Sequence, residues 1–188
     1  MNPPGSRSSR LPLLGLALLF LAPLAVAFWV YYGSAWRPSG RTNHGTLIEP
    51  AHAVPTANQP ANFLRGKWSL VYLGDGACDA DCRSTLYFIR QTWLGLGRLD
   101  ARVQQVFLAT SHCCDQAWLH AEHPQLLTVD TSSDATQPIR AAFPAGDHSH
   151  ELYIVDPLGN LMMSYDAHQD PRGLREDLKK LLDLSHIG

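Results

Sequence analysis

Residues 68–82 read WSLVYLGDGACDADC, a stretch that holds two of the four cysteines of the chain. Residues 68–73 form an apolar run typical of a buried strand, and two glycines mark the turn that follows it. Cys78 and Cys82 then open a helical pattern, which puts both thiols at a strand-to-helix junction. Unpaired backbone N–H groups and the positive end of the helix dipole stabilise thiolates at such a position. Cys78 and Cys82 are therefore the first candidates for redox-active catalytic residues or metal ligands.

The segments after this junction follow the order of an α/β protein. Residues 83–96 carry apolar side chains three or four positions apart, as in a helix packed on a sheet, and residues 103–109 are typical of a second strand. Further patterns predict a helical turn at 117–122, a strand at 126–129, a weak helix at 136–143, a hairpin of strands 152–155 and 161–165, and a closing helix from Pro171. The parallel β–α–β start with a C-terminal hairpin and helix predicts a thioredoxin-like α/β fold.

The N-terminal part of the chain has the composition of a membrane segment. Residues 11–30 are uncharged and mostly apolar, and at roughly 1.5 Å per residue they would span the roughly 30 Å hydrocarbon core. Arg7 and Arg10 precede this run and aromatic residues cluster after it, which favours a cytoplasmic N-terminus. A signal peptide cleaved after Ala27 is the alternative. Both interpretations predict that the rest of the chain lies in the periplasm, on the far side of the inner membrane.

Four segments follow from these patterns. Residues 1–10 are expected to be a cytoplasmic tail, 11–32 a single transmembrane anchor, 33–62 an extended tether rich in proline, and 63–188 the thioredoxin-like domain. The net charge of -2 and the pI of about 6.5 show no basic excess, so nucleic-acid binding is not expected.

Two later loops are expected to meet the cysteine pair. Loops that leave the carboxyl ends of neighbouring parallel strands lie side by side, so residues 110–115 should face Cys78 and Cys82. Residues 145–150, which include His148, should approach from a third side. Thiolates and imidazoles outside the cytoplasm match the preferences of copper, with zinc as the main rival.

These residues carry a resemblance to a known family. The phrase GKWSLVY at 66–72, the Cys78-x-x-x-Cys82 spacing, Asp147-His148-Ser149 and the phrase YIVDPLG at 153–159 resemble the Sco/SenC (PrrC) family of copper chaperones for cytochrome c oxidase assembly, over most of residues 63–184. Asp79 and Arg83 stand where the family usually has proline, and His112-Cys113-Cys114 replaces its acidic loop, so the chain resembles a divergent member.

The resemblance implies a function and a set of metal ligands. Cys78, Cys82 and His148 would bind copper. The protein would deliver copper to the copper centre of cytochrome c oxidase subunit II, or reduce the thiols of that centre. Its partner would be subunit II or another oxidase assembly factor, reached from the membrane through the N-terminal helix.

Several alternatives remain open at this point. Four cysteines allow three pairings, and Cys113 and Cys114 could be resolving thiols or extra ligands. A bond between these neighbours is strained, whereas a bond from either to the first pair is geometrically plausible. The chain could instead be a periplasmic thiol–disulfide oxidoreductase, or a non-catalytic interaction domain in oxidase assembly. His112 and His150 are weaker ligand candidates, and the remaining histidines are expected to be solvated or satisfied: His44, His52, His120, His123, His168 and His186.

Overall fold

The computed structural model describes residues 10–33, 42–56 and 62–188, which form parts of two compact units, Met1–Thr42 and Asn43–Gly188. Most of the predicted tail (residues 1–9) and two parts of the predicted tether (34–41 and 57–61) lie outside the described residues.

The first unit contains one helix, α1 (Arg10–Gly33), which covers the predicted anchor. Residues Leu11–Gly33 are long and apolar enough to cross a membrane, and they are the one such helix in the described ranges. Its leucine, phenylalanine and tryptophan side chains are exposed along the whole helix, as the hydrocarbon core of a bilayer requires. The choice between anchor and cleaved signal peptide stays a prediction.

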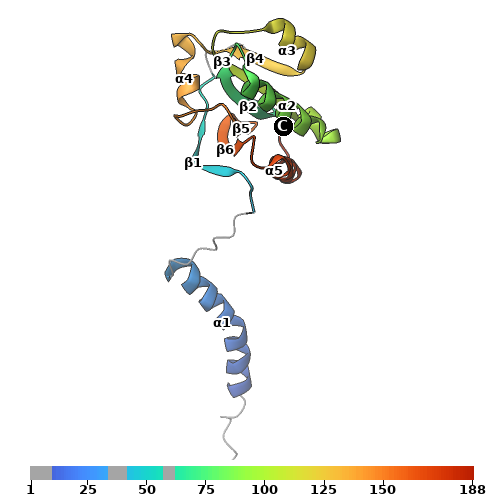
Figure 1. Cartoon of the computed structure of the whole chain (residues 1–188). Helices are drawn as coiled ribbons and strands as arrows, with labels where there is room; N and C mark the ends of the chain where they lie inside the picture. Colours follow the sequence, from blue (N-terminus) through green and yellow to red (C-terminus); the bar gives the residue numbers. More distant parts are fainter. Residues whose placement is uncertain (1–9, 34–41, 57–61) are drawn as a thin grey trace, which may run out of the picture. The chain divides into compact units, whose positions relative to one another are not determined.

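The second unit is built on a six-stranded sheet with the strand order β1-β6-β5-β2-β3-β4 (Figure 1). The strands are β1 (Thr46–Ala53), β2 (Trp68–Asp75), β3 (Val103–Ser111), β4 (Leu126–Asp130), β5 (Glu151–Val155) and β6 (Asn160–Asp166). Strands β2, β3 and β4 are parallel, and β5, β6 and β1 are each antiparallel to their neighbours. This mixed sheet confirms the predicted thioredoxin-like α/β fold.

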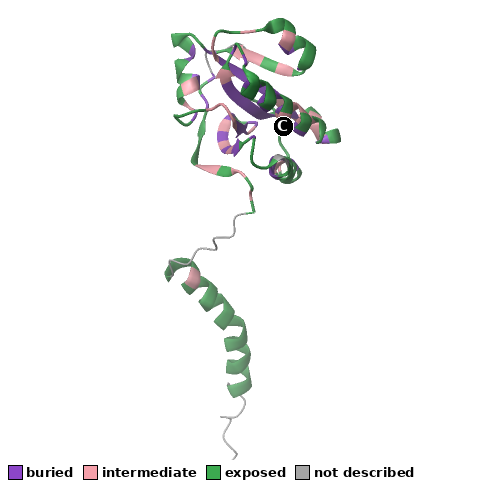
Figure 2. Ribbon diagram, viewed as in Figure 1, coloured by how far each residue is buried: buried purple, intermediate pink, exposed green. Residues whose placement is uncertain are grey.

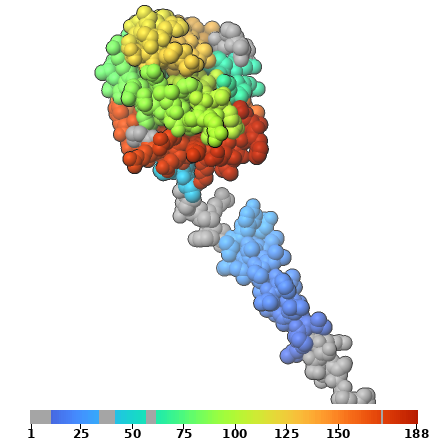
Figure 3. All heavy atoms as spheres, turned by 90° about the vertical axis from the view of Figure 1, so that its right-hand side faces the viewer, coloured from blue at the N-terminus to red at the C-terminus, as the bar shows by residue number. Residues whose placement is uncertain are grey.

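Helices cover both faces of the sheet, because the central strands are apolar on both sides. On one face, α2 (Ala80–Leu94) and α5 (Pro171–Leu184) pack against Tyr72, Phe107 and Ile154. On the other, α4 (Gln137–Ala141) and the turn η3 (Asp134–Thr136) lie over Val71, Leu108 and Tyr153. Figure 2 shows the buried residues concentrated in the sheet, and in Figure 3 atoms of α2 (green) and α5 (red) lie next to each other. The shorter elements are η2 (Gly97–Arg102) and α3 (Gln116–Glu122).

Part of the predicted tether is folded and forms strand β1. It lies inside residues 33–62 but pairs with β6, from Thr46 opposite Ser164 to Ala53 opposite Asn160. Its residues are mostly exposed and do not alternate between apolar and polar, and Pro50 interrupts the pattern, which explains why the sequence pattern did not predict a strand. The chain therefore joins the folded unit at Asn43, earlier than residue 63.

A buried carboxylate fastens the start of β1 to α5. Asp177 accepts hydrogen bonds from the backbone N–H of His44 at 2.6 Å and of Gly45 at 3.1 Å, and from the hydroxyl of Tyr165 at 2.5 Å. Burial acts to raise the pKa of Asp177, but these hydrogen bonds outweigh it and lower the pKa below its ordinary value. In return, the hydrogen bond with Asp177 raises the pKa of His44.

Candidate functional site

Cys78 and Cys82 are joined by a disulfide where β2 leads into α2, with their Cα atoms 5.1 Å apart. Both residues are buried, at 3% and 2% exposure, and yet both line a pocket of about 410 Å³ at the carboxyl end of β2. The loop 146–149 forms another wall of this pocket. The structure therefore brings together the two segments that the sequence predicted to meet.

Local hydrogen bonds explain why the cysteines occupy this junction. The carboxylate of Asp79 caps α2 by accepting from the backbone N–H of Cys82 at 3.0 Å, which satisfies one of the unpaired donors of the first turn. Cys78 has φ of 48°, a left-handed conformation that is uncommon for a residue with a Cβ. Its carbonyl accepts from the side chain of Arg83 at 3.2 Å. The junction is thus held by Asp79 and Arg83.

Asp75 connects the loop after β2 to the loop after β3. Its carboxylate accepts from the backbone N–H of Ala77 at 2.8 Å and the hydroxyl of Ser111 at 2.9 Å, and lies 2.9 Å from Nδ1 of His112. The hydrogen bond from Ala77, followed by those from the other two groups, lowers the pKa of Asp75 to about 2. The carboxylate therefore stays ionised and keeps both loops together at neutral pH. Nδ1 of the exposed His112 is engaged in this contact.

Cys113 and Cys114 form a second disulfide with each other. None of the described cysteines is free, so the pairing that the sequence left open is resolved as two local pairs. The loop that carries this second disulfide lies close to the turn before Cys78. A Cβ built on Gly76 in that turn would lie 2.6 Å from the Cα of Cys113. Only a glycine permits this approach of the two backbones.

His148 lines the same pocket as the two cysteines, but its ring is turned toward Tyr153. Nδ1 of His148 lies 2.8 Å from the hydroxyl of Tyr153, which itself donates to the carboxylate of Glu151. Because the phenolic proton goes to Glu151, the hydroxyl oxygen accepts from Nδ1–H, and Nε2 of the imidazole keeps its lone pair. Tyr153 belongs to the core on the face opposite α2. The three predicted ligands thus share one pocket, and their joint ligation stays a prediction.

The loop that carries His148 is fixed through the neighbouring residue. The carbonyl of Ser149 accepts from the hydroxyl of Tyr72 and from the hydroxyl of Thr85, both at 3.3 Å. The backbone N–H of Ser149 donates to Asp147, which lowers the pKa of that carboxyl. These contacts attach the loop to both β2 and α2.

The electrostatic field around the pocket favours a cation. Burial is the main reason for the raised pKa of Tyr72, and the negative charges of Asp79, Asp81 and Asp147 raise it further. Three carboxylates therefore act on one hydroxyl in the pocket wall. Such a field stabilises a bound cation and disfavours an additional anion.

Tyr153 and Glu151 were not predicted as site residues. Glu151 is the first residue of β5, and Tyr153 lies two residues further along the strand, in an apolar run where a tyrosine is usually a core residue. The sequence signal was the spacing of two residues, which places the carboxylate of Glu151 on the same side of the strand as Tyr153.

Comparisons with known proteins agree with this architecture. A family model described as "Transmembrane-like, thioredoxin-like, C-terminal domain" matches residues 68–185. No curated protein matches the chain.

Solved structures show the same fold at low sequence identity. Apo Sco1 from Thermus thermophilus is 19% identical with a TM-score of 0.58, over 76% of this chain and 99% of that one. Copper-bound ScoI from Arabidopsis thaliana is 20% identical with a TM-score of 0.50, over 65% of this chain and 88% of that one. BsSco, described as having a disulfide switch and as a member of the Sco family of cytochrome c oxidase assembly proteins, is 15% identical with a TM-score of 0.51, over 77% of this chain and 98% of that one. The predicted resemblance to Sco proteins is confirmed at the level of the fold.

Proposed function

Because this chain belongs to the family of transmembrane-like, thioredoxin-like C-terminal domains, we propose that it is a membrane-anchored copper-binding assembly factor of the Sco type. In this proposal α1 anchors the chain in the inner membrane and the folded unit works in the periplasm. The cargo is copper for the copper centre of cytochrome c oxidase subunit II, and the partner is that subunit or another assembly factor. Two of the similar structures support the proposal: ScoI from Arabidopsis thaliana holds bound copper, and BsSco is a member of the Sco family of cytochrome c oxidase assembly proteins.

The observation that carries the proposal is the shared pocket of Cys78, Cys82 and His148. After reduction, two thiolates and an imidazole provide the soft donor set that Cu(I) prefers. A Cα separation of 5.1 Å keeps both sulfurs on the same side of the junction, so both can face one ion. The surrounding carboxylates add a favourable charge.

The hydrogen bonds of His148 suit a ligand role. Metal-binding histidines usually donate their second ring N–H to a carboxylate, a carbonyl or another acceptor, which fixes the tautomer. Tyr153 accepts from Nδ1 and passes the interaction on to Glu151, so Nε2 is the nitrogen left for a metal ion.

A copper titration of the reduced protein tests the proposal. The tag-free full chain in detergent, kept under reductant, should bind about one tight equivalent of Cu(I). Binding should be lost in the Cys78→Ser, Cys82→Ser double variant and weakened in His148→Ala, while the exposed control His186→Ala should behave as wild type. Binding that persists in the double variant would refute this site.

The second disulfide supports a second candidate function, thiol–disulfide exchange. In this reaction a partner thiolate attacks one sulfur of the Cys78–Cys82 disulfide, a mixed disulfide forms, and the other cysteine leaves as a thiolate. Cys113 and Cys114 lie on the adjoining loop and could exchange with the first pair. The test is the reduction potential of each pair in glutathione buffers, followed by mass spectrometry of alkylated cysteines. A Cys78–Cys82 pair that neither equilibrates nor exchanges would exclude this function.

A further inference from the structure

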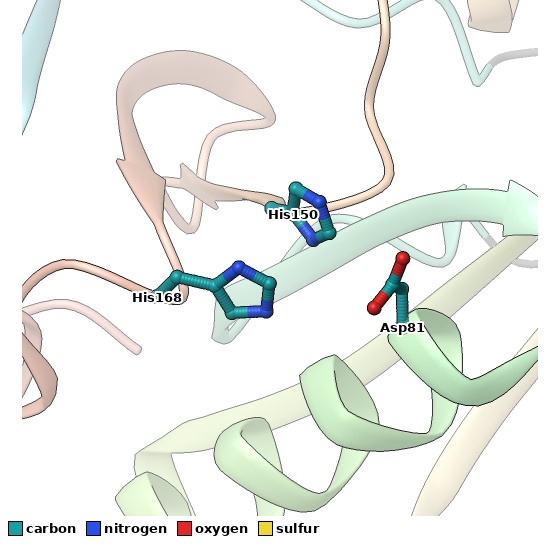
Figure 4. Close-up of side chains that lie close together, drawn as sticks. All are labelled: Asp81, His150 and His168. Carbon is teal, nitrogen blue, oxygen red and sulfur yellow. The ribbon is translucent and has the colours of Figure 1, made fainter.

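A second group of metal-binding side chains lies beside the cysteine junction. Asp81, His150 and His168 each present a ligand atom, and these atoms all lie within 4.8 Å of one another. Figure 4 shows the three side chains converging from α2, from the loop before β5 and from the loop after β6. None of the three belongs to the set of Cys78, Cys82 and His148.

The register of the hairpin explains why the two histidines meet. Glu151 pairs with Asp166 at the open end of the β5–β6 hairpin. The backbone N–H of Ala167 then donates to the carbonyl of His150 at 2.7 Å, which extends the pairing by one step. His150 and His168 therefore lie next to each other, with ring centroids 4.0 Å apart.

The helix α2 adds the carboxylate. Thr85 follows Asp81 by four residues, so the two side chains lie on the same face of α2, one turn apart. The hydroxyl of Thr85 donates to the carbonyl of Ser149, the residue before His150. This contact holds the first turn of α2 against the histidine loop and places Asp81 over the two rings.

The imidazole of His150 has a nitrogen without a protein partner. Its Nδ1 is buried and makes no hydrogen bond to any group in the described part of the chain. Buried polar atoms normally have a partner, so an unsatisfied one calls for an explanation. A ligand bound between the two histidines would fix the orientation of the His150 ring, which no hydrogen bond to Nδ1 fixes in the described part of the chain.

We propose that Asp81, His150 and His168 form a site for a divalent late transition-metal ion, Zn²⁺ or Cu²⁺. Two imidazoles and one carboxylate are a donor set that these ions prefer. With ligand distances of about 2.0–2.2 Å, tetrahedral ligands lie about 3.4 Å apart. Asp81 and His168 are exposed, so small side-chain rotations bring the three atoms from their present spacing to that value. A water molecule would complete the coordination.

This site differs from the proposed Cu(I) site in its dependence on thiol chemistry. Its ligands are nitrogen and oxygen, so it binds metal while Cys78 and Cys82 remain in their disulfide. The inference therefore does not rest on the proposed function, and one site can fail without the other.

Metal titration of the oxidised protein tests the inference. The probe is Zn²⁺ added to the tag-free full chain in detergent without reductant, followed by calorimetry, with Mg²⁺ as a hard-cation control. We expect one equivalent of Zn²⁺ and no comparable Mg²⁺ binding. Asp81→Asn and His168→Ala should each weaken Zn²⁺ binding at least tenfold. The exposed control His120→Ala and the Cys78→Ser, Cys82→Ser double variant should bind as wild type.

An independent readout uses Cu²⁺ in the same oxidised protein. Its electron paramagnetic resonance spectrum should show coupling to imidazole nitrogens, and His168→Ala should reduce the number of coupled nitrogens. Absence of a stoichiometric Zn²⁺ site would overturn the inference, as would binding that survives both single substitutions. Loss of binding in the cysteine double variant would overturn it as well, because the metal would then depend on the cysteine pair and not on these three ligands.

Discussion

Replacing Tyr153 with phenylalanine tests how His148 is prepared for a metal ion. The fully buried hydroxyl of Tyr153 accepts from Nδ1 of His148 at 2.8 Å and donates to Glu151. Tyr153→Phe keeps the ring but removes this link, so Nδ1 and the carboxylate lose their common partner. Losing such an outer partner typically weakens metal binding 10–100-fold. We therefore expect Cu(I) affinity to fall by about 1.4–2.8 kcal/mol.

The assay is a competition between the reduced full chain and a chromophoric Cu(I) chelator. The exposed Tyr87 on α2 provides the matched control, since Tyr87→Phe removes the same hydroxyl away from the pocket. A double-mutant cycle separates positioning from general destabilisation. In the His148→Ala background, Tyr153→Phe should change the affinity by less than about twofold, because neighbours acting through one another are not additive. An equal loss in both backgrounds, or no loss at all, would refute the role assigned to Tyr153.

Three further predictions concern the framework of the folded unit. Gly76→Ala should destabilise it by about 1–3 kcal/mol, because the new Cβ would lie 2.6 Å from the Cα of Cys113; an unchanged melting temperature would contradict this. Asp177→Ala should lower the free energy of unfolding by about 3 kcal/mol, since three donors lose a buried carboxylate; guanidinium unfolding measures it, with the exposed Asp183→Ala as control. The pKa of His44 is raised in the folded protein, so the stability that its protonated ring contributes is present below pH about 6.5 and is lost as the pH rises through the folded pKa. The melting temperature should therefore fall over that pH range, and it should fall less in His44→Ala.

The sequence contains strong signals for the central elements of the fold. The strands β2 and β3 are apolar runs bounded by glycine or polar turns, and α2 and α5 carry apolar stripes, so pattern alone located them. Strand β1 has neither signal. Its residues are mostly exposed, and it is a strand only because β6 offers it backbone partners, a contact between segments more than a hundred residues apart.

The candidate site was predictable where one short stretch determines it. Cys78 and Cys82 are close in sequence, and the strand-to-helix junction decides their placement. The sequence allowed three pairings of the four cysteines, and the adjacency of Cys113 and Cys114 did not by itself select the bond between them. The grouping of His150 with His168 depends on the hairpin register, which is a three-dimensional contact that no local pattern encodes.

The position of Pro50 in β1 has a consequence for how copies of this protein behave side by side. β1 forms one outer edge of the described sheet, and an outer edge is where a second chain can add its own strand. Pro50 offers no N–H for such an addition, and the register shift between Leu47 and His52 breaks the regular ladder. β4, at the other edge, has only five residues. The folded unit thus carries protection against aggregation at both edges of its sheet, and replacing Pro50 with valine would remove part of it.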